Sequence, residues 1–474
     1  MIIMVFSSLV FLCIFFPLVF LLHWVIPNRK VKNGLLLAAS LLFYTYGEPV
    51  YILLMLTSAL LNYVFALLIE KYEKKLFLVL AVVANLAILG VFKYTGFLVS
   101  NVNALLGLAL PVPQISLPVG ISFFTFQALS YVIDVYRKEV AVQKNYGKLL
   151  LYISFFPQLI AGPIVRYKDI AREIDERTVT VRQIAFGLRR FIVGLGKKVL
   201  IANAMGAAAD YIFNHGAANI NILAAWIGAA AYLMQIYYDF SGYSDMAIGL
   251  GKMFGFHFKE NFNHPYIAST VQEFWRRWHI SLSSFFRDYV YIPLGGNRKG
   301  KFRTVLNRII VFFLTGLWHG ANWTFILWGL FHGFFLLLEE FVPLIKKLPK
   351  FLRHIYTILA VTIGFVVFRA DTIGEAVLYI GQMFSGFDFS AGAMSFAIQA
   401  LTPYFIAMLL AAIISCGPLA KLTERISGLE NKETLTAAEN KLQIASFVLA
   451  FLLLGWCIIR LAGGSYNPFI YFRF

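Results

Sequence analysis

Two histidines stand out because the sequence around them is strongly apolar. His319 follows the uncharged run 311–317 and precedes an almost wholly apolar run at 323–338, and His279 lies 40 residues earlier. A titratable group at membrane depth is costly, so it marks a functional site by default. Two imidazoles within one hydrophobic body predict proton transfer in a site that excludes water.

The residues that follow His319 predict a break between two helices. Gly320 is a helix-ending signal, and Asn322 can cap a helix that restarts at residue 323. A break at membrane depth is tolerated only where it lines a cavity or is buried in protein. At a helix C-terminus the helix dipole also favours the imidazolium form, which raises the proton affinity of a base. The structural alternative for His319 is a histidine that simply packs at a kink. We interpret His332, 13 residues later, as a packing or hydrogen-bonding residue.

His279 falls within a segment that we predict as one helix over 270–288. Glu273 and Arg277 have the favourable i,i+4 spacing, and they lie on a narrow polar stripe of this helix. His279 lies on the opposite face, among aromatic and aliphatic side chains. The spacing alone does not distinguish a catalytic imidazole from a core histidine that is hydrogen-bonded to a nearby carbonyl.

The composition indicates a membrane protein. Of the 474 residues, 60% are hydrophobic and 14% are charged, whereas soluble domains are about one quarter charged. The apolar runs are long and continuous, which argues against a transmembrane β-barrel with its short alternating segments. We therefore predict an all-α polytopic membrane protein, with about 11–13 transmembrane or re-entrant helices around a central cavity.

The distribution of charge predicts the topology. The formal net charge is +17, and the basic residues fall in short clusters between apolar spans. This is the pattern of the positive-inside rule, so membrane lipids rather than nucleic acid are the expected counter-charge. Two predicted spans separate successive clusters, which places the clusters on the cytoplasmic face and the N-terminus outside. The three cysteines lack CxxC spacing, so no metal site or disulfide framework is predicted.

The domain organisation is predicted as one integral-membrane domain over residues 1–474. It divides into an N-terminal span group (1–136), a catalytic core (137–371) and a C-terminal span group (372–474). We see no inverted repeat, which weighs against a transporter.

Several longer motifs resemble those of a known family. They are FWRRWHISL at 274–282, RDY at 287–289, IPLGGNR at 292–298 and GLWHGANW at 316–323. These motifs look like the signature of the membrane-bound O-acyltransferases, and within them of the bacterial alginate O-acetyltransferase branch. The resemblance covers nearly the whole chain and is strongest from 118 to 371.

The resemblance implies transfer of an acyl group from a thioester across the bilayer to a hydroxyl acceptor. It maps the two characteristic histidines of the family onto His279 and His319, and it implies that His319 is essential. The expected donor is acetyl-CoA or an acyl-carrier thioester, with no bound cofactor. The expected acceptor is an exported polysaccharide, reached directly or through an extracytoplasmic acetyltransferase or relay protein, and the expected location is the bacterial cell membrane. Candidate substrate-binding or supporting residues are Trp275, Arg276, Trp278, Ser283, Asp288, Trp318, Asn322, Asp239 and Asn263.

We assign the role of general base to His319 as a hypothesis. His279 would polarise the thioester carbonyl, orient the acceptor or shuttle the proton. One alternative keeps this chemistry but changes the product to D-alanylated teichoic acid, acetylated peptidoglycan or an acylated protein. An alternative of another class is a transporter of the acyl donor or polymer, whose flux would survive replacement of His319.

Overall fold

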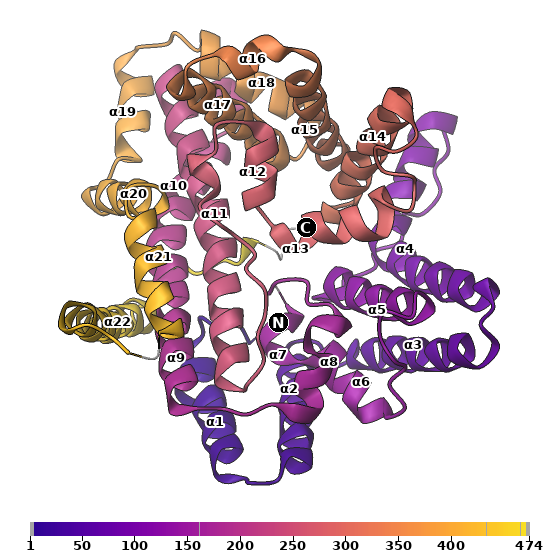
Figure 1. The fold of residues 1–474 in the computed structure, drawn as a ribbon. Helices are drawn as coiled ribbons and strands as arrows, with labels where there is room; N and C mark the ends of the chain where they lie inside the picture. Colours follow the sequence, from indigo (N-terminus) through magenta and orange to yellow (C-terminus); the bar gives the residue numbers. More distant parts are fainter. Residues whose placement is uncertain (1–3, 161, 433, 465, 471–474) are drawn as a thin grey trace. The chain divides into compact units, whose positions relative to one another are not determined.

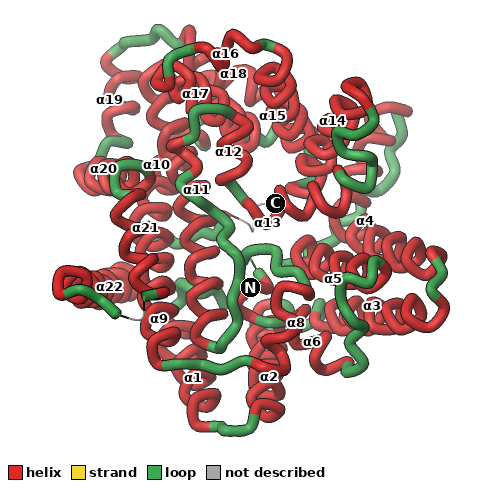
Figure 2. The backbone as a smooth tube through the Cα atoms, in the orientation of Figure 1, coloured by secondary structure: helices red, strands yellow, loops and turns green. Residues whose placement is uncertain are grey.

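The chain consists of helices joined by loops in the computed structural model, which describes residues 4–160, 162–432, 434–464 and 466–470. Figure 2 shows no strand among these residues, which confirms the prediction of an all-α protein. The chain forms two compact units. Unit 1 comprises Met1–Phe191 and Ser244–Lys259, and unit 2 comprises Ile192–Tyr243 and Glu260–Phe474. The three span groups describe the order of membrane segments rather than packing, and they stay a prediction.

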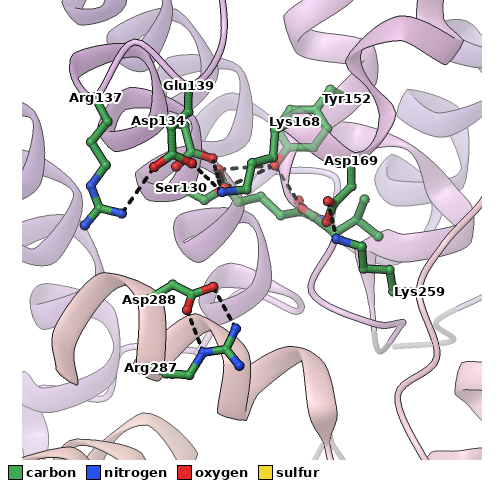
Figure 3. Close-up of polar contacts among 12 residues, drawn as sticks. Ser130, Asp134, Arg137, Glu139, Tyr152, Lys168, Asp169, Lys259, Arg287 and Asp288 are labelled. Atoms are coloured by element: carbon green, nitrogen blue, oxygen red, sulfur yellow. Dashed lines mark hydrogen bonds and ion pairs between the residues drawn. The ribbon is translucent and has the colours of Figure 1, made fainter. Parts of the chain in front are cut away.

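Unit 1 contains the helices that precede residue 181. They are η1 (Phe11–Phe15), α1 (Phe16–Val25), α2 (Arg29–Gly47), α3 (Ile52–Tyr72), α4 (Lys75–Leu106), α5 (Ile121–Tyr136), α6 (Tyr146–Ser154), α7 (Phe156–Leu159) and α8 (Tyr167–Glu176). Lys168 on α8 places its Nζ atom 2.6 Å from Glu139 and 3.6 Å from Asp134 (Figure 3). Asp134 is fully buried on α5, so Lys168 supplies the opposite charge that a buried carboxylate needs.

Two long helices, α9 and α11, contribute residues to both units, and the later helices belong to unit 2. From residue 181 to residue 291 the helices are α9 (Val181–Gly196), η2 (Lys197–Ala202), α10 (Asn203–Phe213), η3 (Ala217–Asn219), α11 (Ile222–Met253), η4 (Pro265–Ile267), α12 (Val271–Arg277), α13 (Ile280–Phe286) and η5 (Arg287–Tyr291). The remaining helices are α14 (Gly300–His319), α15 (Trp323–Phe341), α16 (Pro343–Lys347), α17 (Lys350–Arg369), α18 (Ile373–Ser385), α19 (Ala391–Gln399), α20 (Pro403–Cys416), α21 (Ala420–Gly428), η6 (Leu429–Asn431) and α22 (Ala437–Ala462).

Six helical segments of the described chain are long and apolar enough to cross a membrane, and the bent pair α19–α20 makes a seventh if it counts as one span. The six are Ile52–Tyr72, Lys75–Leu106, Val181–Phe213, Trp323–Phe341, Lys350–Arg369 and Ala437–Ala462. The chain is therefore a multi-pass membrane protein. Other predicted membrane elements, such as α11, are not among these segments.

Helices α14 and α15 form the closest helical pair in the neighbourhood of His319, and Figure 1 shows them side by side. Glycines make this approach possible. A methyl group on Gly316 would collide with the carbonyl oxygen of Phe325, and one on Gly329 would collide with that of Phe312. Backbone therefore packs directly on backbone along this pair, which fixes the end of α14 where His319 lies.

Candidate active site

His279 and His319 line one small cavity within unit 2, so the structure brings together the two histidines that the sequence singled out. The cavity has a volume of about 20 Å³, which is room for about one water-sized group. Its other walls are aromatic or aliphatic. They are formed by Ile236, Phe240, Trp278, Trp328, Phe365, Phe368 and Ile470.

His279 lies at a break between α12 and α13, so the prediction of one continuous helix over 270–288 is wrong at this point. Its φ angle is 43°, in the left-handed region, which costs a residue with a side chain roughly 1–2 kcal/mol. Asn261 explains the break, because its carbonyl oxygen accepts the N–H of Ile280 at 2.9 Å and its side-chain oxygen accepts the N–H of Ser281 at 3.2 Å. These bonds replace the helical hydrogen bonds that a continuous helix would make.

Asn261 also determines which nitrogen of His279 carries the proton. Its Oδ1 atom lies 3.1 Å from Nδ1 of His279 and accepts the Ser281 hydroxyl at 2.8 Å, so Nδ1–H is the donor to Asn261. Nε2 of His279 has no hydrogen-bond partner among the described residues. Burial lowers the pKa of His279, so the imidazole is neutral at pH 7. The pattern therefore leaves Nε2 as a hydrogen-bond acceptor.

His319 is the last residue of α14, as predicted from Gly320 and Asn322. Gly320 continues in extended backbone with a φ of −174°, and the Asn322 side chain caps α15 by accepting the N–H of Thr324 at 3.1 Å. The Asn322 amide also donates to the carbonyl oxygen of Asp371 at 2.8 Å. These contacts confirm the predicted helix break and place the imidazole at a helix C-terminus, where the dipole favours a positive charge.

Aromatic rings enclose His319, which is only 8% exposed. The ring centroids of Trp318, Trp328 and Phe368 lie 4.9, 4.9 and 5.1 Å from that of His319, and all three rings are close to perpendicular to it. Trp318 also lies 5.8 Å from His279, centroid to centroid. The Trp318 indole thus contacts both imidazoles, which gives this predicted supporting residue a position between them.

Comparison with known proteins identifies the family of this chain. The model of the membrane-bound O-acyltransferase family matches residues 41–382. A probable alginate O-acetylase of Azotobacter vinelandii is 40% identical over 99% of this chain and 100% of its own length. This chain belongs to the membrane-bound O-acyltransferase family. The peptidoglycan O-acetyltransferase of Helicobacter pylori is 37% identical over 80% of each chain. The teichoic acid D-alanyltransferase of Bacillus subtilis is 31% identical over 52% of this chain and 65% of its own length.

The protein is therefore an acyltransferase, and the remaining candidate residues can be placed around its two histidines. Trp278 lines the cavity. Trp275 lies behind it, with its ring 5.1 Å from that of His332 and 5.5 Å from that of Trp328. Ser283 donates its hydroxyl to the carbonyl oxygen of Trp275 at 3.3 Å, so it joins α13 to α12. These residues support the cavity from behind.

Of the nine predicted supporting residues of this acyltransferase, only Trp278 lines the cavity that the described residues form. Three of the other eight are exposed or make contacts with residues other than the histidines. Arg276 and Asn263 are exposed, and the contacts of Asn263 with Arg277 are made by its backbone. Asp288 forms an ion pair with the neighbouring Arg287 at 2.7 Å (Figure 3). The sequence pattern selected them because they lie in or beside the motifs, but the structure does not place them in the cavity wall.

Asp239, also predicted, is buried next to the cavity residue Phe240 and forms an ion pair with Lys198 at 2.8 Å. Sequence reasoning missed Lys198, Asn261 and Ile470. Asn261 was detectable, because it belongs to the same polar break as Asn263, two residues later. Ile470 carries no signal of its own, since one aliphatic residue far from the motifs looks like any other.

Proposed function

We propose that this acyltransferase moves an acetyl group from a cytoplasmic thioester across the bilayer to hydroxyls of an exported polysaccharide, or to an extracytoplasmic relay protein. One observation carries the proposal. Two buried histidines, His279 and His319, line a single cavity whose other walls are apolar or aromatic.

The proposed reaction needs a base because a sugar hydroxyl is a poor nucleophile at neutral pH. His319 takes the hydroxyl proton while the hydroxyl oxygen attacks the thioester carbonyl. The carbon–sulfur bond then breaks, and the proton passes from His319 to the departing thiolate. Positioned proton transfer of this kind contributes about 10²–10⁴-fold to the rate.

For His279 the hydrogen-bond pattern argues against one of the three roles considered from the sequence, polarisation of the thioester carbonyl. Its Nδ1–H is committed to Asn261, so the neutral ring has no N–H to offer a thioester carbonyl. Nε2 can instead accept a hydrogen bond from the acceptor hydroxyl and orient it, or receive its proton. We therefore propose that His279 orients the acceptor while His319 acts as the base.

The aromatic lining supports acyl transfer over hydrolysis. Water and a sugar hydroxyl compete for the same carbonyl carbon, and a thioester that meets bulk water is lost without transfer. Trp318, Trp328 and Phe368 surround His319 and leave little room for solvent. Exclusion of water also strengthens each electrostatic interaction within the cavity.

The membrane orientation and the donor rest on charge and on the named relatives. The basic segment 166–198 and the other clusters are expected on the cytoplasmic side of the bacterial cell membrane, with the N-terminus outside. Such clusters attract a phosphate-bearing donor, which suits acetyl-CoA or an acyl-carrier thioester. The polymer acceptor is proposed from the names of the alginate and peptidoglycan relatives.

The test is acetyl transfer from radiolabelled acetyl-CoA to a polysaccharide acceptor, with purified protein in liposomes. Wild type is compared with His319→Ala, His279→Ala and His332→Leu. His332 is a matched control because it is fully buried beside Trp328 but does not line the cavity. We expect transfer by wild type and His332→Leu, and its loss in His319→Ala while that variant stays monodisperse.

Each other result has a definite meaning. Equal transfer by wild type and His319→Ala would contradict base catalysis by His319. If wild type transfers no acetyl group from acetyl-CoA but does so from an acyl-carrier thioester, the donor is the carrier thioester and the proposed mechanism stands. Transfer of D-alanine rather than acetyl would show that this chain catalyses the reaction named for the Bacillus subtilis relative.

A further inference from the structure

The segment 466–470, here called the tail, is held residue by residue against η2, α10 and α11 in unit 2. Each of its five residues contacts a different partner on these helices. The pairs are Tyr466 with Asp210, Asn467 with Asn203, Pro468 with Lys198, Phe469 with Tyr243, and Ile470 with Asp239. A chain segment that merely covered a surface would not need a separate partner for each residue.

The centre of this attachment is a buried ion pair. Lys198 and Asp239 lie 2.8 Å apart, and each side chain is only 2% exposed. Nζ of Lys198 also donates to Oδ1 of Asn203 at 3.0 Å and to the carbonyl oxygen of Pro468. Oδ2 of Asp239 accepts the backbone N–H of Ile470 at 2.8 Å. Both members of the pair therefore bind the tail, Lys198 at Pro468 and Asp239 at Ile470.

The tail reaches the cavity through Ile470, which is 6% exposed and lies in the wall of the cavity that contains His279 and His319. The position of this wall depends on Asp239, because its carboxylate accepts the hydrogen bond from the backbone N–H of Ile470 and so holds the Ile470 backbone. Asp239 directly precedes Phe240, another wall residue. The Asp239 carboxylate therefore holds one wall residue, Ile470, and lies next to another in the sequence.

Stability alone is a weak explanation for a buried ion pair. Taking two charges out of water costs several kcal/mol for each ion, and well-packed apolar residues in the same place are often equally or more stabilising. What an apolar pair cannot supply is a directional acceptor for the Ile470 N–H and a donor for the Pro468 carbonyl.

We propose that Lys198 and Asp239 are positioning residues for acyl transfer, which hold the tail so that Ile470 closes the cavity of the two histidines. The inference rests on the proposed function, since the wall matters only if the cavity is where the acyl group is transferred. Ile470 keeps water from the thioester, and the ion pair keeps Ile470 in place. Loss of either element raises hydrolysis of the donor relative to transfer.

The experiment compares four forms of the full chain in detergent. The double variant Lys198→Met/Asp239→Leu replaces the ion pair with apolar side chains of similar size and leaves no buried charge. Ile470→Ala shortens the wall but keeps the N–H that binds Asp239. Ile220→Ala is the matched control, because Ile220 is also buried, at 4% exposed, but does not line the cavity.

Two quantities are measured for each form. The first is the rate at which carboxypeptidase Y removes residues 466–470, followed by intact mass. The second is the ratio of acetyl-CoA hydrolysis to acetyl transfer. In the double variant we expect tail removal to be faster by about tenfold, because its anchored state is lost, and the hydrolysis ratio to rise. In Ile470→Ala the tail stays protected while the ratio rises by about threefold to tenfold. Ile220→Ala leaves both quantities at the wild-type level.

Two results would overturn the inference. One is a folded double variant whose tail is removed no faster than that of wild type. The other is a released tail, or a shortened Ile470, with an unchanged ratio of hydrolysis to transfer. Tail removal needs no acyl donor, so its outcome is independent of the proposed function. If wild type transfers no acetyl group from any thioester, the proposed function fails, and tail removal still decides whether the ion pair anchors the segment.

Discussion

The two histidines lie at two helix breaks that are built in different ways. At His279 hydrogen bonds that Asn261 accepts create the break and assign the proton to Nδ1. At His319 the break follows from Gly320 and Asn322, and the imidazole is held by perpendicular aromatic rings. A perpendicular ring also packs against His279, because the Phe240 centroid lies 4.6 Å away, so what distinguishes His279 is the bond from its Nδ1–H to Asn261. A proton committed in this way suits a group that orients a partner.

The largest effect is expected at the ring-packed histidine. His319→Gln keeps the size of the side chain but removes the base, so acetyl transfer should fall by about 10²–10⁴-fold. The measurement is kcat with labelled acetyl-CoA in liposomes, together with the melting temperature. If the variant melts like wild type and retains more than a tenth of the wild-type kcat, His319 is not the base.

A smaller loss is expected at the hydrogen-bonded histidine. His279→Asn suits the left-handed backbone, because asparagine adopts this region more readily than most residues. It removes the imidazole acceptor, so transfer should fall by about 10–100-fold through lost orientation of the acceptor. The check is KM for the acceptor alongside kcat. If His279→Asn is as inactive as His319→Gln, the two histidines act as one unit and the comparison fails.

A third variant separates the position of His279 from its chemistry. Asn261→Ala leaves both histidines in place but removes the acceptor for His279 and Ser281, which should lower the free energy of unfolding by about 1–3 kcal/mol. Transfer should fall by about tenfold, because Nδ1 is no longer committed as the donor. Denaturant unfolding and kcat are measured on the same preparation. Unchanged transfer would show that the hydrogen bond serves only the helix break.

The smallest effect is expected at Asp288, which a motif-based choice would rank beside the histidines. Its ion pair with Arg287 is partly exposed, and such pairs contribute about 0–1 kcal/mol. Asp288→Asn should therefore leave kcat within about twofold of wild type. A hundredfold loss would place Asp288 in contact with a substrate and extend the site beyond the cavity.

The same comparison explains what the sequence could predict. The break at His319 was predictable because its causes, Gly320 and Asn322, are immediate neighbours. The break at His279 was not, because its cause is Asn261, which lies 18 residues earlier and meets it only in the folded chain. Local propensity favoured a continuous helix there, and tertiary hydrogen bonds prevailed.

The same limit applies to the residues that complete the cavity. Asp239 was selected from the sequence as a carboxylate in an apolar stretch, but its partners Lys198 and Ile470 lie 41 and 231 residues away. A motif records the residues that do chemistry. It does not record the apolar residues that enclose them.

The glycine contacts between α14 and α15 have a consequence for movement. With Gly316 and Gly329 packed against opposing carbonyl oxygens, the two backbones leave no space between them at these positions, so we expect little movement of one helix relative to the other. The cavity holds only about one water-sized group and must widen to admit an acyl thioester and a hydroxyl. This pair carries His319 and Trp328, and we do not expect it to provide that widening. We therefore expect the motion that admits substrates in the opposite walls of the cavity, so that those walls rather than the helix that carries the base control the rate of substrate entry.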